Sequence, residues 1–189
     1  MDRRELLKMV ALATGGAVIG GEFFLAGCKN KDAGSGMVFT QDNIAFLDEV
    51  AETILPKSNT PGAKDAEVGK FMTVMVNDCY EEKDQKIFHE GIGKLDEACN
   101  KMHGHGFMKA DAAHRKELLT ALDKEAKDNA EKKKTNKDLP NHYFSQIKQL
   151  TLLGFFTSKP GLTECFDYHA VPGKYDGAMP YKKGDKLFA

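Results

Sequence analysis

Hydrophobic residues recur at helical spacing in five stretches of the chain, and polar residues fill the positions between them. Apolar side chains three and four residues apart lie on one face of an α-helix, which can then be buried against its neighbours. No stretch alternates strongly enough to favour a β-strand. The pattern predicts an all-α fold, a bundle of about five helices with an extended irregular C-terminal tail. The expected helices run from Thr40 to Leu55, Val68 to Cys79, Glu82 to Met102, Asp111 to Ala126 and Pro140 to Phe156.

Residues with special backbone preferences mark several of these helix ends. Thr40 and Asp111 suit the N-cap position, because their side-chain oxygens accept hydrogen bonds from the first free N–H groups of a helix. Pro56 stops the first helix, and Gly104 ends the third. The polar stretch of residues 127–138 has two interpretations, a solvated extension of the fourth helix or a mobile loop.

The C-terminal tail is rich in aromatic residues for a segment without a helical pattern. After Pro160 and Gly161 we expect one helical turn over residues 162–166 and irregular backbone over residues 171–189. Aromatic rings on such backbone must pack against something, so they either fold back over the bundle or dock on a partner. The candidate partner-interface residues are the aromatic pair that ends the fifth helix and three tyrosines of the tail: Phe155, Phe156, Tyr168, Tyr175 and Tyr181.

Residues 1–27 have the organisation of an export signal. Arg3 and Arg4 precede an apolar stretch, residues 9–27, that contains several glycines and Glu22. This stretch is too weakly apolar for a spanning helix, which needs about 20 predominantly apolar residues. We interpret it as a signal peptide whose arginine pair directs it to the twin-arginine route, which exports folded proteins. The alternative is that the pair belongs to the basic start of a general secretory signal.

The segment Leu25–Cys28 matches a lipobox, because small residues precede a cysteine that can be lipidated. Acyl chains on Cys28 add about 0.8 kcal/mol of membrane affinity per buried CH₂, so two or more chains make a stable anchor. We expect a lipid-anchored protein that faces the periplasm of a bacterial cell envelope. Residues 28–38 then form a flexible tether and residues 39–189 a single helical domain. Lys29 replaces the aspartate that retains some lipoproteins at the inner membrane, which favours the outer membrane.

Composition and motifs exclude several function classes. The formal net charge is −1 and no basic cluster suits a nucleic acid. Hydrophobic residues make up 41% of the chain and charged residues 29%, the balance of an ordinary globular domain. The sequence has no phosphate-binding glycine loop, zinc-protease motif or serine-hydrolase motif, so we expect no catalytic residue and no cofactor-binding residue in this chain.

Three cysteines remain besides the lipidation site, in a compartment that permits disulfides. We interpret Cys79, Cys99 and Cys165 as buried residues on helix faces. One disulfide with one free thiol is the alternative.

Histidines offer a candidate metal site. His103 and His105, together with His89 or His114, could supply imidazole ligands around a glycine turn. No acidic or cysteine ligand stands at a familiar spacing from them. We therefore interpret the segment as an exposed loop that holds no metal.

Five blocks of sequence, in matching order, resemble the gluconate 2-dehydrogenase subunit 3 family, the small or gamma subunit of membrane-associated sugar dehydrogenases. The blocks extend over most of the chain, which makes the resemblance specific. They are residues 2–5, Thr53–Pro56 with Thr60–Ala66, Met75–Tyr80, Leu150–Ser158 and Val171–Gly177.

The resemblance implies a complex in which a FAD-containing large subunit of the glucose-methanol-choline oxidoreductase type oxidises a sugar or sugar acid. In many relatives a cytochrome c, with haem c in a third subunit, accepts the electrons. The small subunit carries no flavin; it escorts the folded large subunit, which commonly lacks its own signal peptide. Ala178 stands where many relatives have cysteine, so their disulfide does not carry over. The alternative function is an independent envelope lipoprotein that binds a small ligand between its helices.

Overall fold

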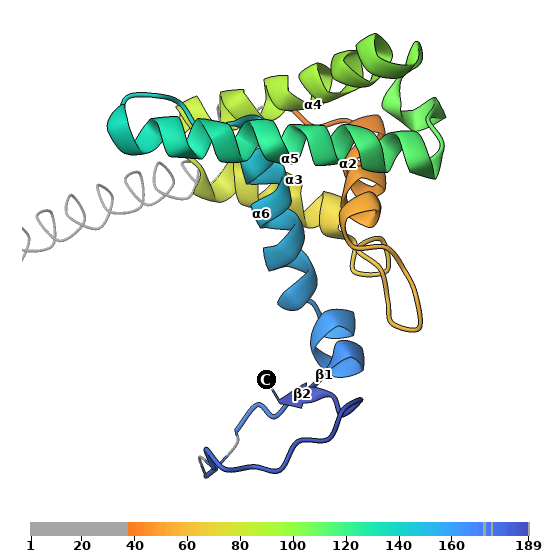
Figure 1. Cartoon of the computed structure of the whole chain (residues 1–189), viewed down its shortest axis with the longest axis vertical. Helices are drawn as coiled ribbons and strands as arrows, with labels where there is room; N and C mark the ends of the chain where they lie inside the picture. The colour runs from red at the N-terminus through yellow and green to blue at the C-terminus, as the bar shows by residue number, and fades with distance from the viewer. Residues whose placement is uncertain (1–37, 172, 175, 189) are drawn as a thin grey trace, which may run out of the picture. The chain divides into compact units, whose positions relative to one another are not determined.

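The computed structural model describes residues 38–171, 173–174 and 176–188, and most of them are helical (Figure 1). Short elements follow or separate the long helices: η2 (Phe107–Lys109), the π-helix η3 (Gly161–Cys165), β1 (Phe166–Asp167) and β2 (Leu187–Phe188). The prediction of an all-α bundle with a C-terminal tail is confirmed. The long helices are α2 (Gln41–Ile54), α3 (Val68–Cys79), α4 (Glu82–His103), α5 (Ala112–Thr135) and α6 (Tyr143–Phe156).

The expected capping residues define the helix ends. The Thr40 hydroxyl accepts a hydrogen bond from the Asn43 N–H at 3.2 Å, and the Asn43 side chain accepts one from the Thr40 N–H at 3.0 Å. Asp111 accepts from the His114 N–H at 2.8 Å and caps α5 in the same way. At the end of α4, Gly104 has a φ of 79°, a left-handed conformation that a residue without Cβ adopts readily.

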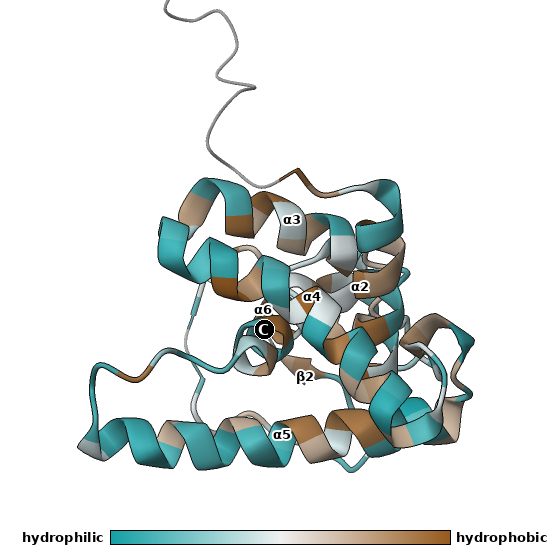
Figure 2. Cartoon of the chain, turned by 90° about the horizontal axis from the view of Figure 1, so that it is seen from above, coloured by the Kyte–Doolittle hydropathy of each residue, from teal (hydrophilic) through white to brown (hydrophobic). Residues whose placement is uncertain are grey.

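Helix α5 decides between the two interpretations of residues 127–138. It continues to Thr135, beyond its last buried residue, Ala126. Figure 2 shows this second half of the helix as almost wholly hydrophilic. The polar stretch is therefore a solvated helix end as far as Thr135, and a loop only after it.

The core is built around α6, which contacts α2, α3, α4 and α5. Figure 2 shows α6 between α4 and α5. Each surrounding helix contributes fully buried side chains, because its apolar residues share one face. Examples with no exposed area are Leu47, Met72, Phe88 and Leu95, and α6 itself contributes Ile147.

Two expectations need correction. The tail contains a short parallel pairing, Phe166 with Leu187 and Asp167 with Phe188, where we expected no strand. Two residues per strand are too few to produce an alternating sequence pattern. The helical turn expected at residues 162–166 is the π-helix η3.

The cysteines also differ from expectation. Cys99 is fully buried, as expected, whereas Cys165 is partly buried and Cys79 is exposed. Cys79 is the last residue of α3 and follows the final buried residue of that helix, Val76, so it turns toward solvent. All three thiols are free. The structure therefore contains no disulfide among them, which was the alternative.

The signal peptide (residues 1–27), Arg3, Arg4, Cys28 and most of the tether lie outside the described residues. Val38, the first described residue, is 84% exposed. Within the described part of the chain, no helix has both the length and the apolar character needed to cross a membrane.

Candidate partner-binding surface

The C-terminal end of α6 presents apolar side chains on two sides. Phe155 is only 5% exposed and belongs to the core, whereas Leu152, Leu153 and Phe156 are 37–42% exposed. The inner face is closely packed: a Cβ on Gly154 would lie 2.6 Å from the Phe71 ring. The segment is apolar all round, so one face enters the bundle and the other is left without a partner within it.

A sharp turn after α6 brings the tail back onto the helix end. Ser158 Oγ donates a hydrogen bond to the Phe155 carbonyl at 2.7 Å and accepts one from the Gly161 N–H at 3.0 Å. Only glycine fits at position 161, because a Cβ there would lie 2.0 Å from the Phe155 carbonyl oxygen. The turn places the Phe166 ring edge-on against Phe156, with centroids 5.6 Å apart.

The tail loop, residues 166–188, is closed by the pairing of β1 with β2. Three further contacts hold it: His169 stacks on Phe188 with centroids 4.9 Å apart, Lys186 Nζ donates to the Thr163 carbonyl at 3.4 Å, and the Lys182 N–H donates to Asp185 at 2.9 Å. In Figure 1 the loop lies beyond the C-terminal end of α6. Most of these contacts join residues of the loop to one another.

The structure separates the aromatic residues that the sequence grouped. Phe166 packs back on the bundle through Phe156, whereas Tyr168 and Tyr181 remain 46% and 63% exposed. Tyr175 lies outside the described residues. Phe166 therefore follows the first alternative, folding back over the bundle, whereas for the exposed Tyr168 and Tyr181 docking on a partner stays a prediction.

The structure also adds residues that we did not select from the sequence. We define the α6–tail surface as the exposed leucine and aromatic residues of the helix end and the tail loop. They are Leu152, Leu153, Phe156, Tyr168, Tyr181, Leu187 and Phe188. The signal for the two helical leucines was present, since an uninterrupted apolar run has more faces than one core can bury.

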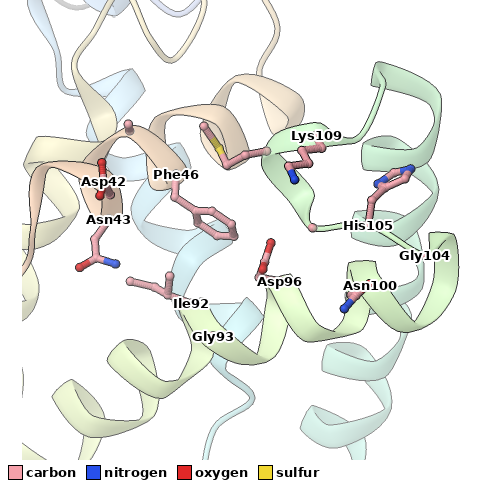
Figure 3. Close-up of a pocket in the computed structure, with 13 residues that line it drawn as sticks. Asp42, Asn43, Phe46, Ile92, Gly93, Asp96, Asn100, Gly104, His105 and Lys109 are labelled. Carbon is pink, nitrogen blue, oxygen red and sulfur yellow. The ribbon is translucent and has the colours of Figure 1, made fainter.

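A groove of about 750 Å³ lies between α2, α4 and the loop that contains η2 (Figure 3). Asp42 and Asn43 lie at one end, Phe46 and Ile92 lie in the middle, and His105 lies at the other end. Asp96 Oδ1 accepts a hydrogen bond from the Phe107 N–H at 2.7 Å, which ties the η2 side of the groove to α4. Phe46 and Ile92 give the middle of the groove an apolar surface beside this carboxylate.

The histidines are brought together in part. His103, His105 and His114 lie in contact, whereas His89 packs on Phe39 elsewhere. Gly104 is exposed and the three rings are partly exposed, so the glycine turn lies at the surface, with His114 of α5 against its two histidines. As the side chains lie, no three ligand groups of the described residues are arranged to hold a metal ion.

Comparison with known families gives one result. The family model of gluconate 2-dehydrogenase subunit 3 matches residues 41–173. The chain belongs to this family. Membership gives it a subunit role in a dehydrogenase complex. No curated protein and no solved structure shows significant similarity to the chain.

The match defines which parts of this subunit 3 chain are typical of the family. It includes all five long helices and the exposed residues Phe156 and Tyr168. Tyr181, Leu187 and Phe188 lie after the matched range. The α6–tail surface therefore combines a family-typical helix end with residues from the rest of the tail loop.

Proposed function

We propose that this chain is the non-catalytic small subunit of a periplasmic, flavin-dependent gluconate or sugar dehydrogenase complex. It escorts a FAD-containing large subunit of the glucose-methanol-choline oxidoreductase type through the twin-arginine route and anchors it to the membrane through Cys28. The observation that carries the proposal is the subunit 3 family match over residues 41–173. The paired export signals Arg3-Arg4 and Leu25–Cys28 support the escort and anchor roles.

The α6–tail surface supports a binding role for the folded part of the chain. Its exposed aromatic residues Phe156, Tyr168, Tyr181 and Phe188 are of the type that dominates binding energy at interfaces. Burying one such side chain contributes about 1.5–3 kcal/mol relative to leaving it in water. We assign this surface to the large subunit.

The redox chemistry belongs to the partners in this proposal. FAD is held by the large subunit, and a cytochrome c with haem c in a third subunit receives the electrons. The small subunit contributes position: it fixes the large subunit at the membrane, and we expect the outer membrane.

Substitution of the export signal tests the escort role. Arg3→Lys with Arg4→Lys keeps the positive charge but removes the arginine pair, so it blocks the twin-arginine route and leaves a general secretory start intact. We expect the co-expressed large subunit and its FAD absorbance to remain in the cytoplasm. A large subunit that still reaches the periplasm would overturn the escort proposal.

Cys28→Ser is the matched control for the anchor. It leaves the arginine pair in place and removes the acyl chains, so the complex should be exported and recovered in the soluble periplasmic fraction. If the variant complex remained in the membrane fraction, Cys28 would not be its anchor.

A double variant tests the surface. Tyr168→Ala with Tyr181→Ala should weaken binding of the FAD-loaded large subunit at least about tenfold, since two anchors of roughly 1 kcal/mol or more are removed. Met102→Ala is the control, because Met102 is 46% exposed on α4, outside the surface. Equal affinity of both variants would remove the α6–tail surface from the interface.

The groove of Figure 3 favours one alternative function, an envelope lipoprotein that binds a small apolar ligand. Ala45→Glu would place a charge at an exposed position that lines this groove and should abolish such binding. In the dehydrogenase proposal the same variant still co-purifies with FAD. Flavin absorbance after purification through a C-terminal tag distinguishes the two functions.

A further inference from the structure

Three histidines from consecutive elements meet at one end of the helical bundle. His103 is the last residue of α4, His105 lies in the turn that follows, and His114 lies in the first turn of α5. The rings form a triangle with centroid separations of 4.2 Å between His103 and His114, 5.6 Å between His105 and His114, and 6.2 Å between His103 and His105. The site thus joins two helix ends and the loop between them.

Each ring has one nitrogen that is shielded from water and has no hydrogen-bond partner. These atoms are Nε2 of His103, Nδ1 of His105 and Nδ1 of His114. A shielded polar atom without a partner costs roughly 1–3 kcal/mol, so three of them in one cluster need a physical reason. A neutral imidazole nitrogen of this kind is also the atom that binds a metal.

A carboxylate lies beside the cluster. Asp111 Oδ1 lies 3.4 Å from Nδ1 of His114, although the two atoms do not form a hydrogen bond. The Asp111 carboxylate thus places oxygen atoms beside the three rings, and a carboxylate oxygen is an accepted ligand of zinc-class ions.

We propose that His103, His105 and His114 bind a divalent transition-metal ion of the zinc class. In a tetrahedral site with metal–nitrogen bonds of about 2.0–2.1 Å, imidazole centres lie roughly 5 Å apart, and the three observed separations fall on either side of that value. The rings stack, so coordination requires them to turn about their Cβ–Cγ bonds until the three nitrogens face one point. Water or Asp111 completes the coordination.

The ligand set decides which cations fit. Three imidazoles suit Zn²⁺, Co²⁺, Ni²⁺ or Cu²⁺, whereas Mg²⁺ and Ca²⁺ require oxygen ligands. The bound ion would join the end of α4 to the start of α5. It would also fix the His105 end of the groove in Figure 3.

Cobalt spectroscopy tests the proposal on the unaltered full-length chain, purified in detergent without a histidine tag. One equivalent of Co²⁺ should produce the intense visible bands of a four- or five-coordinate ion, and Zn²⁺ should displace them. A spectrum that remains that of the hydrated ion would overturn the proposal.

Variants then identify the ligands. Zn²⁺ affinity, measured by calorimetry, should fall at least about tenfold in His105→Gln and in His114→Gln. Removing a residue that only hydrogen-bonds a metal ligand already lowers affinity about tenfold or more, and removing the ligand itself should cost at least as much. His89→Gln is the matched control, since it removes a histidine that packs on Phe39 away from the cluster. Circular dichroism establishes that each variant is folded. Equal affinity in His105→Gln and His89→Gln would overturn the assignment, whatever the cobalt spectrum.

Discussion

The helical bundle and the tail loop are held together by different physics. In the bundle, side chains such as Leu47, Phe88 and Ile147 have at most a trace of exposed area, and they come from helices distant in sequence. In the tail loop, Tyr168 and Tyr181 are 46% and 63% exposed, and order comes from contacts within the loop, such as the stacking of His169 on Phe188. The bundle uses its apolar residues for its own stability, whereas the tail loop leaves its aromatics available to a partner.

The largest effect should come from the bundle. Leu47→Ala removes a side chain with no exposed area from α2 and should lower the free energy of unfolding by about 2–5 kcal/mol, because both buried apolar surface and packing are lost. Chemical denaturation followed by circular dichroism measures it. A loss below 1 kcal/mol, roughly that of a surface change, would mean that α2 is not part of the core.

An ion pair at the edge of the bundle gives the next effect. Arg115 Nη1 lies 2.6 Å from Glu49 Oε2, and Arg115 also donates to the Phe107 and Met108 carbonyls at 3.1 and 3.2 Å. Arg115→Met should cost about 1.5–3 kcal/mol, because hydrogen bonds to charged groups are among the stronger ones.

Arg115→Lys is the matched variant. It keeps the charge but loses the planar fork, so its loss in unfolding free energy should lie between wild type and Arg115→Met. Equal losses in the two variants would show that the planar guanidinium fork, and not the positive charge, supplies the stabilisation.

Two glycines of α4 form a natural pair. A Cβ on Gly91 would lie 2.6 Å from the Tyr143 Cβ, whereas a Cβ on Gly93 would meet nothing within 4 Å. Gly91→Ala should destabilise by about 1–3 kcal/mol through overpacking against α6. Gly93→Ala should stabilise by up to about 1 kcal/mol through helix propensity. Thermal denaturation of both variants measures the contrast, and shifts of the same sign would contradict it.

The start of α6 should respond to pH. Desolvation lowers the pKa of His142, partly opposed by Glu125, and His142 Nδ1 accepts a hydrogen bond from the Phe144 N–H at 3.3 Å. The unfolded chain therefore takes up this proton more readily, so the stabilisation is full above about pH 6.5 and is lost as pH falls toward the folded-state pKa. His142→Asn keeps a capping side chain that does not titrate. Melting points at pH 7 and pH 5 should differ less in this variant than in wild type; an equal fall in both would contradict the prediction.

The smallest effect on stability should come from the tail loop. Tyr168→Ala with Tyr181→Ala should change the free energy of unfolding by no more than about 0.5 kcal/mol, since both rings are already largely exposed. The same denaturation assay as for Leu47→Ala measures it. A loss comparable to that of Leu47→Ala would show that the tail loop stabilises the bundle, and the contrast between the two regions would be wrong.

Much of the bundle could be predicted because its signals are local. Thr40, Gly104 and Asp111 mark helix ends through their own backbone and side-chain chemistry, and the apolar faces follow from spacing alone. Cys79 was misassigned, because membership of an apolar face does not say where a helix leaves the core. The β1–β2 pairing joins residues about twenty positions apart through backbone groups, which leave no pattern in the sequence.

The candidate sites were less predictable for the same reason. Phe155 and Phe156 are adjacent and chemically identical, yet one is 5% exposed and the other 40%, because only the packing of α6 decides which side faces the core. The sequence left His89 and His114 as alternatives beside His103 and His105. Only the packing of the start of α5 shows that His114 is the neighbour.

The sequence by itself determined the helical class, most of the helix boundaries and the family, because these depend on residue spacing and on blocks of residues read along the chain. Only the tertiary structure decided which aromatic rings are left exposed on the α6–tail surface and which histidines share a site. Exposure and proximity are set by segments that lie far apart in the chain and pack together, and packing is a property of the whole fold.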